Sequence, residues 1–230
     1  MPTLKVSYIN FLTEDLFELQ LERGDIPFES GNCLALFNAG EESRPYSIAA
    51  GTGEEVLRFL IRRVPNGEVS AWLARRKPGD PVRASAPFGW FRPGQSEEGE
   101  EAVFVATGTG IAPFLSYLRS TPHRPPVACL YGVGHEKEAF ALDELRQLPY
   151  FRLAVSRQAA EGCFHGRVTG LLGELPRNPQ AHYYLCGLDA MIDEVSAWLE
   201  DHQIDYSHIH REVFFYAEEQ RTELAADQQG

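Results

Sequence analysis

The chain has 230 residues, 43% of them apolar and 23% charged, a composition typical of globular proteins that excludes a disordered chain. Its net charge of −12 disfavours nucleic acid as a partner, because duplex binding depends on a basic surface that neutralises phosphates. No apolar run approaches the roughly 18 residues of a membrane span, and no secretory signal is evident, so we expect no membrane span and a cytoplasmic protein.

The four cysteines, Cys33, Cys129, Cys163 and Cys186, are scattered and form no C-x-x-C pair. This spacing supports neither a zinc site nor a cysteine-ligated iron–sulfur cluster, so we expect no metal. A disulfide scaffold is equally unexpected in a chain of this size without secretion. All except Cys186 are therefore predicted to be small buried apolar residues, and Cys186 belongs to a motif described below.

Residues 5–59 carry apolar side chains in short, strand-length groups separated by turn-forming residues, which predicts a barrel or sandwich. Within this region, Arg44, Tyr46 and Ser47 place a cation, an aromatic ring and a hydroxyl on one short extended piece. Taken alone, they could equally be a surface charge, a half-buried aromatic and a turn residue.

A strand carrying Arg62 follows, and then a turn ending at Gly67 leads into a helix that opens near Val69, with Ser70 in its first turn. Phosphate suits this place, because free helix N–H groups, a hydroxyl and a guanidinium can all donate to one anion. The alternative is that Ser70 only caps the helix.

Four motifs in order resemble the flavin-binding barrel of the ferredoxin–NADP reductase family, in its short bacterial branch: RPYS, NGEVS, PGDPV and PFG. The resemblance implies FAD rather than FMN, because FMN-using relatives end the phosphate loop differently. It implies that Arg44 contacts the flavin pyrophosphate, that Tyr46 stacks on the isoalloxazine ring and that Ser47 hydrogen-bonds near the flavin N5. The phosphate contacts that it implies are Gly67, Val69 and Ser70, with Arg62 close by.

Residues 93–101 are polar and acidic, so we place a domain boundary there, between an FAD-binding domain (1–98) and a nucleotide-binding domain (99–230). Residues 103–118 then read as a strand, a glycine turn and a helix start, where backbone N–H groups can approach a pyrophosphate. The string ATGTGIAP resembles the family's nicotinamide-nucleotide turn. Its predicted pyrophosphate and nicotinamide-side contacts are Gly108, Thr109 and Gly110.

The C-terminal half alternates strands with helices, expected at 141–148 and 190–202, which predicts a parallel sheet covered by helices. The predicted fold class is therefore a β barrel plus α/β. An N-terminal antiparallel Greek-key FAD-binding barrel precedes a parallel-sheet nucleotide-binding domain.

Ser156, Arg157 and Arg167 match positions at which the family holds the 2′-phosphate of NADP(H). Two guanidiniums and a hydroxyl suit a dianion. Both arginines could instead be ordinary surface residues, and NADH-using relatives can also carry Ser-Arg here. Close bacterial relatives place an arginine after the strand at 127–132, where this chain offers only Lys137. NADP(H) is predicted over NADH.

Two further motifs complete the resemblance. CGLDAMIDEV resembles the nicotinamide-pocket motif, so that Cys186 packs beside the nicotinamide and is followed by Gly187. Near the end of the chain, Glu212 matches the family's carboxylate, Phe214 the flavin-stacking aromatic and Phe215 an adenine-stacking position. The predicted catalytic set is thus Ser47, Cys186 and Glu212. The tail at 217–230 either folds over the FAD or is a solvated terminus.

Together the motifs imply an FAD-dependent ferredoxin/flavodoxin–NADP(H) reductase, with hydride exchanged at the flavin N5 and single electrons passed to a separate carrier protein. Eight basic residues against two acidic ones between Arg58 and Arg92 predict a dock for an acidic ferredoxin or flavodoxin, unless they serve the FAD phosphates and a solvated face. The alternative functions are an NAD(P)H-dependent flavin reductase, an oxygenase-partner reductase, or a flavin-holding sensor without turnover.

Overall fold

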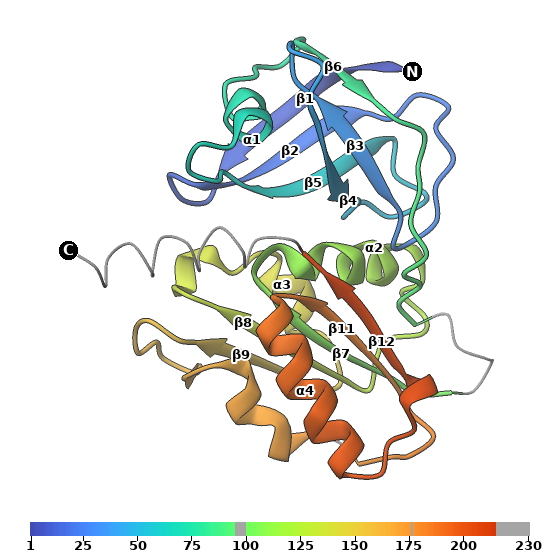
Figure 1. The fold of residues 1–230 in the computed structure, drawn as a ribbon, viewed down its shortest axis with the longest axis vertical. Helices are drawn as coiled ribbons and strands as arrows, with labels where there is room; N and C mark the ends of the chain where they lie inside the picture. Colours follow the sequence, from blue (N-terminus) through green and yellow to red (C-terminus); the bar gives the residue numbers. More distant parts are fainter. Residues whose placement is uncertain (95–99, 176, 215–230) are drawn as a thin grey trace.

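The computed structural model describes residues 1–94, 100–175 and 177–214, which form two six-stranded sheets, one above the other in Figure 1. The upper sheet contains β1 (Thr3–Phe11), β2 (Leu16–Glu22), β3 (Cys33–Phe37), β4 (Ser43–Ser47), β5 (Val56–Arg62) and β6 (Pro81–Ala84), and helix α1 (Glu68–Leu73) lies between β5 and β6. None of the helices in these described ranges is long and apolar enough to cross a membrane.

The first sheet closes into a barrel. Its strands run in the order β4-β3-β6-β1-β2-β5, and every pairing is antiparallel. The two ends of that order meet, because Ile48 bridges Phe59 and the Ala49 N–H donates to the Arg58 carbonyl at 2.8 Å. Alternate apolar side chains fill the interior, with Phe17 and Phe59 fully buried. The predicted antiparallel barrel is confirmed.

The second sheet is entirely parallel. It contains β7 (Ala102–Thr107), β8 (Ala128–Val133), β9 (Phe151–Val155), β10 (Phe164–His165), β11 (His182–Gly187) and β12 (Ile209–Val213). Between the strands lie helices α2 (Ala112–Ser120), α3 (Leu142–Leu145) and α4 (Asp189–Asp201) and the 3₁₀ turns η1 (Gly108–Ile111), η2 (Glu136–Glu138), η3 (Val168–Glu174) and η4 (Tyr206–His208).

The strand order β10-β9-β8-β7-β11-β12 reverses direction between β7 and β11. In open parallel sheets, ligands bind beyond the carboxyl ends of the strands at such a switch point. β7 and β8 are buried along nearly their whole length, as strands covered on both faces must be. The α/β part of the predicted fold class is also confirmed, and the switch point fixes where its site lies.

Two local expectations were too simple. The helix expected at 141–148 is the single turn α3, which starts after Ala141 in a left-handed conformation (φ 56) and stops well before Leu148. Leu148 precedes Pro149, and a residue before proline avoids helical geometry. Cys163 is partly exposed rather than buried.

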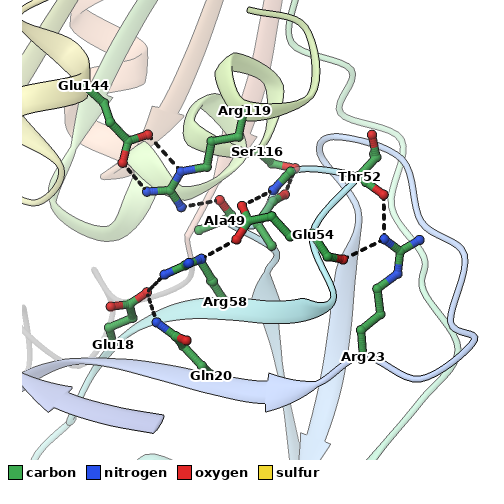
Figure 2. A network of polar contacts seen from close by, with 12 residues as sticks. Glu18, Gln20, Arg23, Ala49, Thr52, Glu54, Arg58, Ser116, Arg119 and Glu144 are labelled. Atoms are coloured by element: carbon green, nitrogen blue, oxygen red, sulfur yellow. Dashed lines mark hydrogen bonds and ion pairs between the residues drawn. The ribbon is translucent and has the colours of Figure 1, made fainter. Parts of the chain in front are cut away.

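A polar network on α2 joins the two sheets (Figure 2). Arg119 donates to the Ala49 carbonyl of the barrel at 2.8 Å and forms a two-pronged ion pair with Glu144 at 2.6 and 2.8 Å. One turn earlier, the buried Ser116 hydroxyl donates to the Ala50 carbonyl at 2.8 Å. These bonds satisfy barrel carbonyls with donors from the second sheet's first helix, so they hold the two parts in one orientation.

Arg119→Ala is expected to lower the free energy of unfolding by about 1–3 kcal/mol, because it leaves the Ala49 carbonyl without this donor and Glu144 without its partner. Urea unfolding followed by circular dichroism measures the change. Arg146→Ala is the control, because Arg146 is largely exposed and pairs only at 3.9 Å with Asp143. Equal losses for the two variants would mean that the network adds nothing to stability.

Candidate functional site

The glycine turn after β7 lies at the switch point of the parallel sheet. A Cβ at Gly110 would lie 2.3 Å from the Cys186 carbonyl oxygen, so only glycine lets η1 approach the end of β11 this closely. Gly108 has φ +53, and no atom lies within 4 Å of the position that its Cβ would take. The turn therefore packs tightly against β11 at Gly110 but has free space beside Gly108. A ligand can approach the backbone of the turn at Gly108. Thr109 lies between these two glycines, half-buried.

Four side chains meet where the barrel faces the carboxyl ends of β11 and β12. Ser47 and Cys33 lie opposite each other on β4 and β3, and their Oγ and Sγ atoms are 3.3 Å apart. Glu212 and Cys186 lie opposite each other on β12 and β11. The Glu212 carboxylate lies 3.7 Å from the Cys33 sulfur and 4.0 Å from the Cys186 sulfur. The fold therefore brings the three predicted catalytic residues together, with Cys33 as a fourth member.

Burial sets the protonation of this cluster. Loss of hydration raises the pKa of Glu212 to about 7, although the Cys33 hydrogen bond and the positive charge of Arg92 oppose the rise. Burial, and then the charge of Glu212, also raise the pKa of the Cys186 thiol well above its usual value. Glu212 can therefore hold or release a proton near neutral pH, whereas Cys186 stays a neutral thiol and is not a nucleophile.

Phe214 follows β12 and lies beside the end of β11. Its backbone N–H donates to the Gly187 carbonyl at 3.0 Å, and its half-buried ring packs against the apolar core that includes Cys186. Phe214 therefore follows the strand that carries Glu212 and is hydrogen-bonded to the end of β11. Phe215 and the tail at 217–230 lie outside the described residues.

The barrel residues expected to contact the flavin do not all lie at the cluster. Tyr46 is 6% exposed and packs within the apolar core of the barrel, and Arg44 is exposed. Gly67 caps α1, Val69 is buried, and the Ser70 hydroxyl accepts a hydrogen bond from the Val64 N–H at 3.2 Å. The structure therefore does not bring Arg44 into the cluster around Ser47.

A hollow of about 490 Å³ lies beside the start of α1, lined by residues that include Asn66, Gly67, Glu68 and Arg75. Because it holds a carboxylate beside the guanidinium, it does not single out a phosphate. The glycine turn, open at Gly108, fits the phosphates of a dinucleotide cofactor.

Arg62 has a partner that its expected phosphate role did not include. Its guanidinium pairs with Glu138 of η2, in the second domain, at 3.2 Å, and Glu138 also accepts from the Gly134 and His135 N–H groups at 3.0 and 3.2 Å. Burial opposes ionisation of Glu138, but Arg62 and these N–H donors outweigh it and lower the pKa of Glu138. Arg62 therefore links the barrel to the loop after β8.

The residues expected at the 2′-phosphate lie at one edge of the second sheet. Ser156 and Arg157 follow β9, Arg167 follows β10, and these strands pair with Val155 opposite His165. The Ser156 hydroxyl donates to the Val133 carbonyl at 3.3 Å. Both guanidiniums are exposed, and neither forms an ion pair within the described ranges. Two unneutralised cations on adjacent loops suit an anion.

Sequence reasoning missed Cys33 and Glu138. Cys33 was expected to be a small apolar residue, and only the register that sets it opposite Ser47 reveals its polar contacts. No motif marks Glu138. Its position becomes meaningful only when the loop after β8 lies against Arg62.

Comparisons with known proteins agree with this geometry. Residues 9–92 match the model for the oxidoreductase FAD-binding domain, and residues 104–197 match that for the oxidoreductase NAD-binding domain. Ferredoxin–NADP reductase B of Sorangium cellulosum is 33% identical over 204 residues, which cover 77% of this chain and 82% of that protein. The fold matches a ferredoxin NADP+ reductase from Neisseria gonorrhoeae, crystallised with FAD and NADP, at a TM-score of 0.84 and 21% identity, over 93% of this chain and 98% of that one.

A third relative comes from an oxygenase system. The ferredoxin–NAD(P)(+) reductase component of the naphthalene 1,2-dioxygenase/salicylate 5-hydroxylase systems of Ralstonia sp. is 29% identical over 223 residues, which cover 91% of this chain and 68% of that protein. These matches agree with the barrel, with the parallel sheet whose strand order reverses at β7, and with the cluster at their junction. They show that the chain is related to these reductases. The chain is an FAD- and NAD(P)-dependent oxidoreductase that belongs to the ferredoxin–NADP reductase family.

Proposed function

We propose that this protein exchanges hydride with NADP(H) and passes single electrons to a separate ferredoxin or flavodoxin. The observation that carries the proposal is the meeting of Ser47 with Cys186 and Glu212, where the barrel faces the switch point of the nucleotide sheet. When bound, FAD supplies the conversion between a two-electron hydride and single electrons. The family matches on either side of residues 93–103 support a boundary between domains at 98 and 99.

Each residue of the cluster has a proposed task. Ser47 orients the reacting edge of the cofactor through its hydroxyl, and Glu212 holds or releases a proton near neutral pH. Cys186, fully buried and neutral, packs beside the nicotinamide, and the ring of Phe214 excludes water until the nicotinamide arrives. Tyr46 and Arg44 remain proposed flavin contacts, as do Gly67, Val69, Ser70 and Arg62 around the phosphates. Phe215 remains a proposed adenine contact.

For the nucleotide, we propose NADPH as the preferred form. Replacing Arg157 and Arg167 together by alanine is expected to raise the KM for NADPH by about 10²-fold or more, because each loses a charge-assisted bond to the 2′-phosphate. NADH lacks that phosphate, so its KM should change little. Steady-state kinetics with both nucleotides measure the split.

The matched control is Arg152→Ala, at the opposite end of β9, where Arg152 pairs with Glu174 at 2.6 Å. It should leave both KM values unchanged. Equal losses for NADPH and NADH in the double variant would remove the 2′-phosphate assignment.

The proposed carrier dock is smaller than the sequence predicts. Six of the eight basic residues between Arg58 and Arg92 form ion pairs within the protein: Arg58, Arg62, Arg63, Arg76, Arg83 and Arg92. The side chains of Arg75 and Lys77, after α1, are exposed and form no ion pair among the described residues. The attraction for an acidic carrier is therefore concentrated at the end of α1.

Reversing the charge of Arg75 and Lys77 is expected to slow reduction of an acidic ferredoxin or flavodoxin by about tenfold or more at low salt, because steering by complementary charge is lost. The salt dependence of the rate should weaken with it. Arg146→Glu together with Arg177→Glu, two reversals of exposed residues on the second domain, controls for net charge. A carrier rate that ignores both salt and these substitutions would rule out an electrostatic dock.

A second candidate, the reductase of an oxygenase system, is favoured by the Ralstonia relative, which matches 91% of this chain. A panel of acceptors at fixed NADPH separates the candidates: ferredoxin, flavodoxin, an oxygenase-type ferredoxin and free FMN. Fast turnover with protein carriers and slow turnover with free FMN supports the proposal. Turnover with free FMN alone would identify a flavin reductase instead.

A further inference from the structure

Cys33 occupies the centre of the cluster. Its sulfur lies between the Ser47 hydroxyl, at 3.3 Å, and a carboxylate oxygen of Glu212, at 3.7 Å. The side chains of Cys33 and Ser47 are both nearly fully buried, at 7% and 5% exposure. The contact crosses the domain junction, because β3 and β4 belong to the barrel and β12 to the parallel sheet. The Cys33 thiol therefore connects the Ser47 hydroxyl in the barrel to the Glu212 carboxylate in the parallel sheet.

The chemistry of a neutral thiol suits a bridge. Burial, and then the negative charge of Glu212, raise the pKa of Cys33 to about 12, so the sulfur keeps its proton at all pH values at which the protein works. A thiol has one S–H donor and a sulfur that accepts weakly. With two polar neighbours, it can donate to only one of them and must accept from the other.

The direction of the bridge follows the proton on Glu212. When Glu212 is ionised, the S–H donates to the carboxylate and the sulfur accepts from the Ser47 hydroxyl. When Glu212 is protonated, its O–H donates to the sulfur and the S–H donates to the Ser47 oxygen. The Ser47 hydroxyl hydrogen is then free to turn toward the reacting edge. Glu212 gains or loses one proton to its surroundings in this reversal. Cys33 and Ser47 each keep their own proton and change only the group to which they donate.

We propose that Cys33 is a positioning residue whose thiol couples the protonation of Glu212 to the direction of the Ser47 hydroxyl. The role of this coupling in turnover rests on the proposed function, but the hydrogen-bond bridge does not. The other groups that act on Glu212 are Cys186 on β11 and the positive charge of Arg92 after β6. His210, two residues earlier on β12, stacks on His182 and Tyr184 instead.

The test measures the pKa of Glu212 directly in the full-length FAD-loaded protein. Glutamate labelled with ¹³C at the carboxyl carbon is titrated by NMR, and the Glu212 signal is assigned by its loss in Glu212→Gln. Cys33→Val keeps the volume and removes the donor, so the pKa of Glu212 should rise by about half a unit or more. Cys33→Ser restores a donor and should shift it less. Cys129→Ala, which removes a fully buried thiol on β8, should not shift it.

An unchanged pKa in Cys33→Val, or an equal shift in Cys129→Ala or Cys33→Ser, would overturn the bridge. The infrared S–H band of Cys33, assigned by its loss in Cys33→Val, tests the reversal. It should move to lower frequency as the pH rises through the titration of Glu212, and this movement should be absent in Glu212→Gln. A band that ignores the titration would also overturn the proposal. Neither readout requires turnover, so a protein that NADPH does not reduce would contradict the proposed function and leave the bridge standing.

Discussion

Glu212→Gln is expected to slow reduction of the bound flavin by NADPH by about 10²-fold at neutral pH, the usual effect of losing a positioned acid–base group. The carboxyl has a pKa of about 7 and lies between the Cys33 and Cys186 sulfurs, so it alone in the cluster changes charge in the working range. The wild-type rate should therefore change with pH around 7. That change should be absent in the variant, as measured by stopped-flow absorbance.

The same substitution should stabilise the folded protein at high pH. The pKa of Glu212 is raised on folding from 4.5 to about 7, so the folded state binds more protons than the unfolded state between these values. Stability then falls as pH rises through that window, and the loss is complete above pH 7. Glutamine cannot ionise, so Glu212→Gln should be more stable than wild type at pH 8 and similar at pH 4. Lower stability at pH 8 would contradict the burial of this charge.

Gly110→Ala is expected to destabilise the protein by about 1–3 kcal/mol and to weaken NADPH binding severely, because overpacking forces the backbone apart. The new Cβ would lie 2.3 Å from the Cys186 carbonyl oxygen and 2.8 Å from the Gly187 Cα, and neither is a side chain that can swing away. The turn after β7 must then separate from the end of β11. Urea unfolding and NADPH titration measure the two effects.

The control for Gly110 is Gly173→Ala in η3, where nothing lies within 4 Å of the added Cβ. That change should leave stability the same or slightly higher, because alanine restricts the unfolded chain. If Gly110→Ala and Gly173→Ala had the same stability and the same NADPH affinity, a Cβ at Gly110 would be tolerated, which contradicts the close approach of the turn to β11.

The architecture was predictable because its signals are local. Short apolar groups gave the barrel strands, and the run from Val103 through Gly110 to Leu118 marked the nucleotide turn before any partner was known. That no helix would extend through Leu148 was also open to prediction, because Pro149 follows it. The sequence could not show that only residues 142–145 of the expected helix at 141–148 would be helical in the folded protein.

The site was only partly predictable, because its chemistry depends on contacts between distant strands. Ser47, Cys186 and Glu212 were found through motifs, but Cys33 has none, and its contact with Glu212 spans the domain junction. Counting charges between Arg58 and Arg92 overestimated the basic surface for the same reason. Arg62 and Arg83 are neutralised by Glu138 and Glu41, which no local sequence pattern connects to them.

The most direct test of the central claim is anaerobic stopped-flow mixing of the FAD-loaded protein with NADPH or NADH, followed by addition of oxidised ferredoxin or flavodoxin. We expect NADPH to bleach the flavin absorbance faster than NADH, and the carrier to restore it in one-electron steps. A flavin that neither nucleotide bleaches would contradict the account. It would leave a protein with the family's fold and without its reaction.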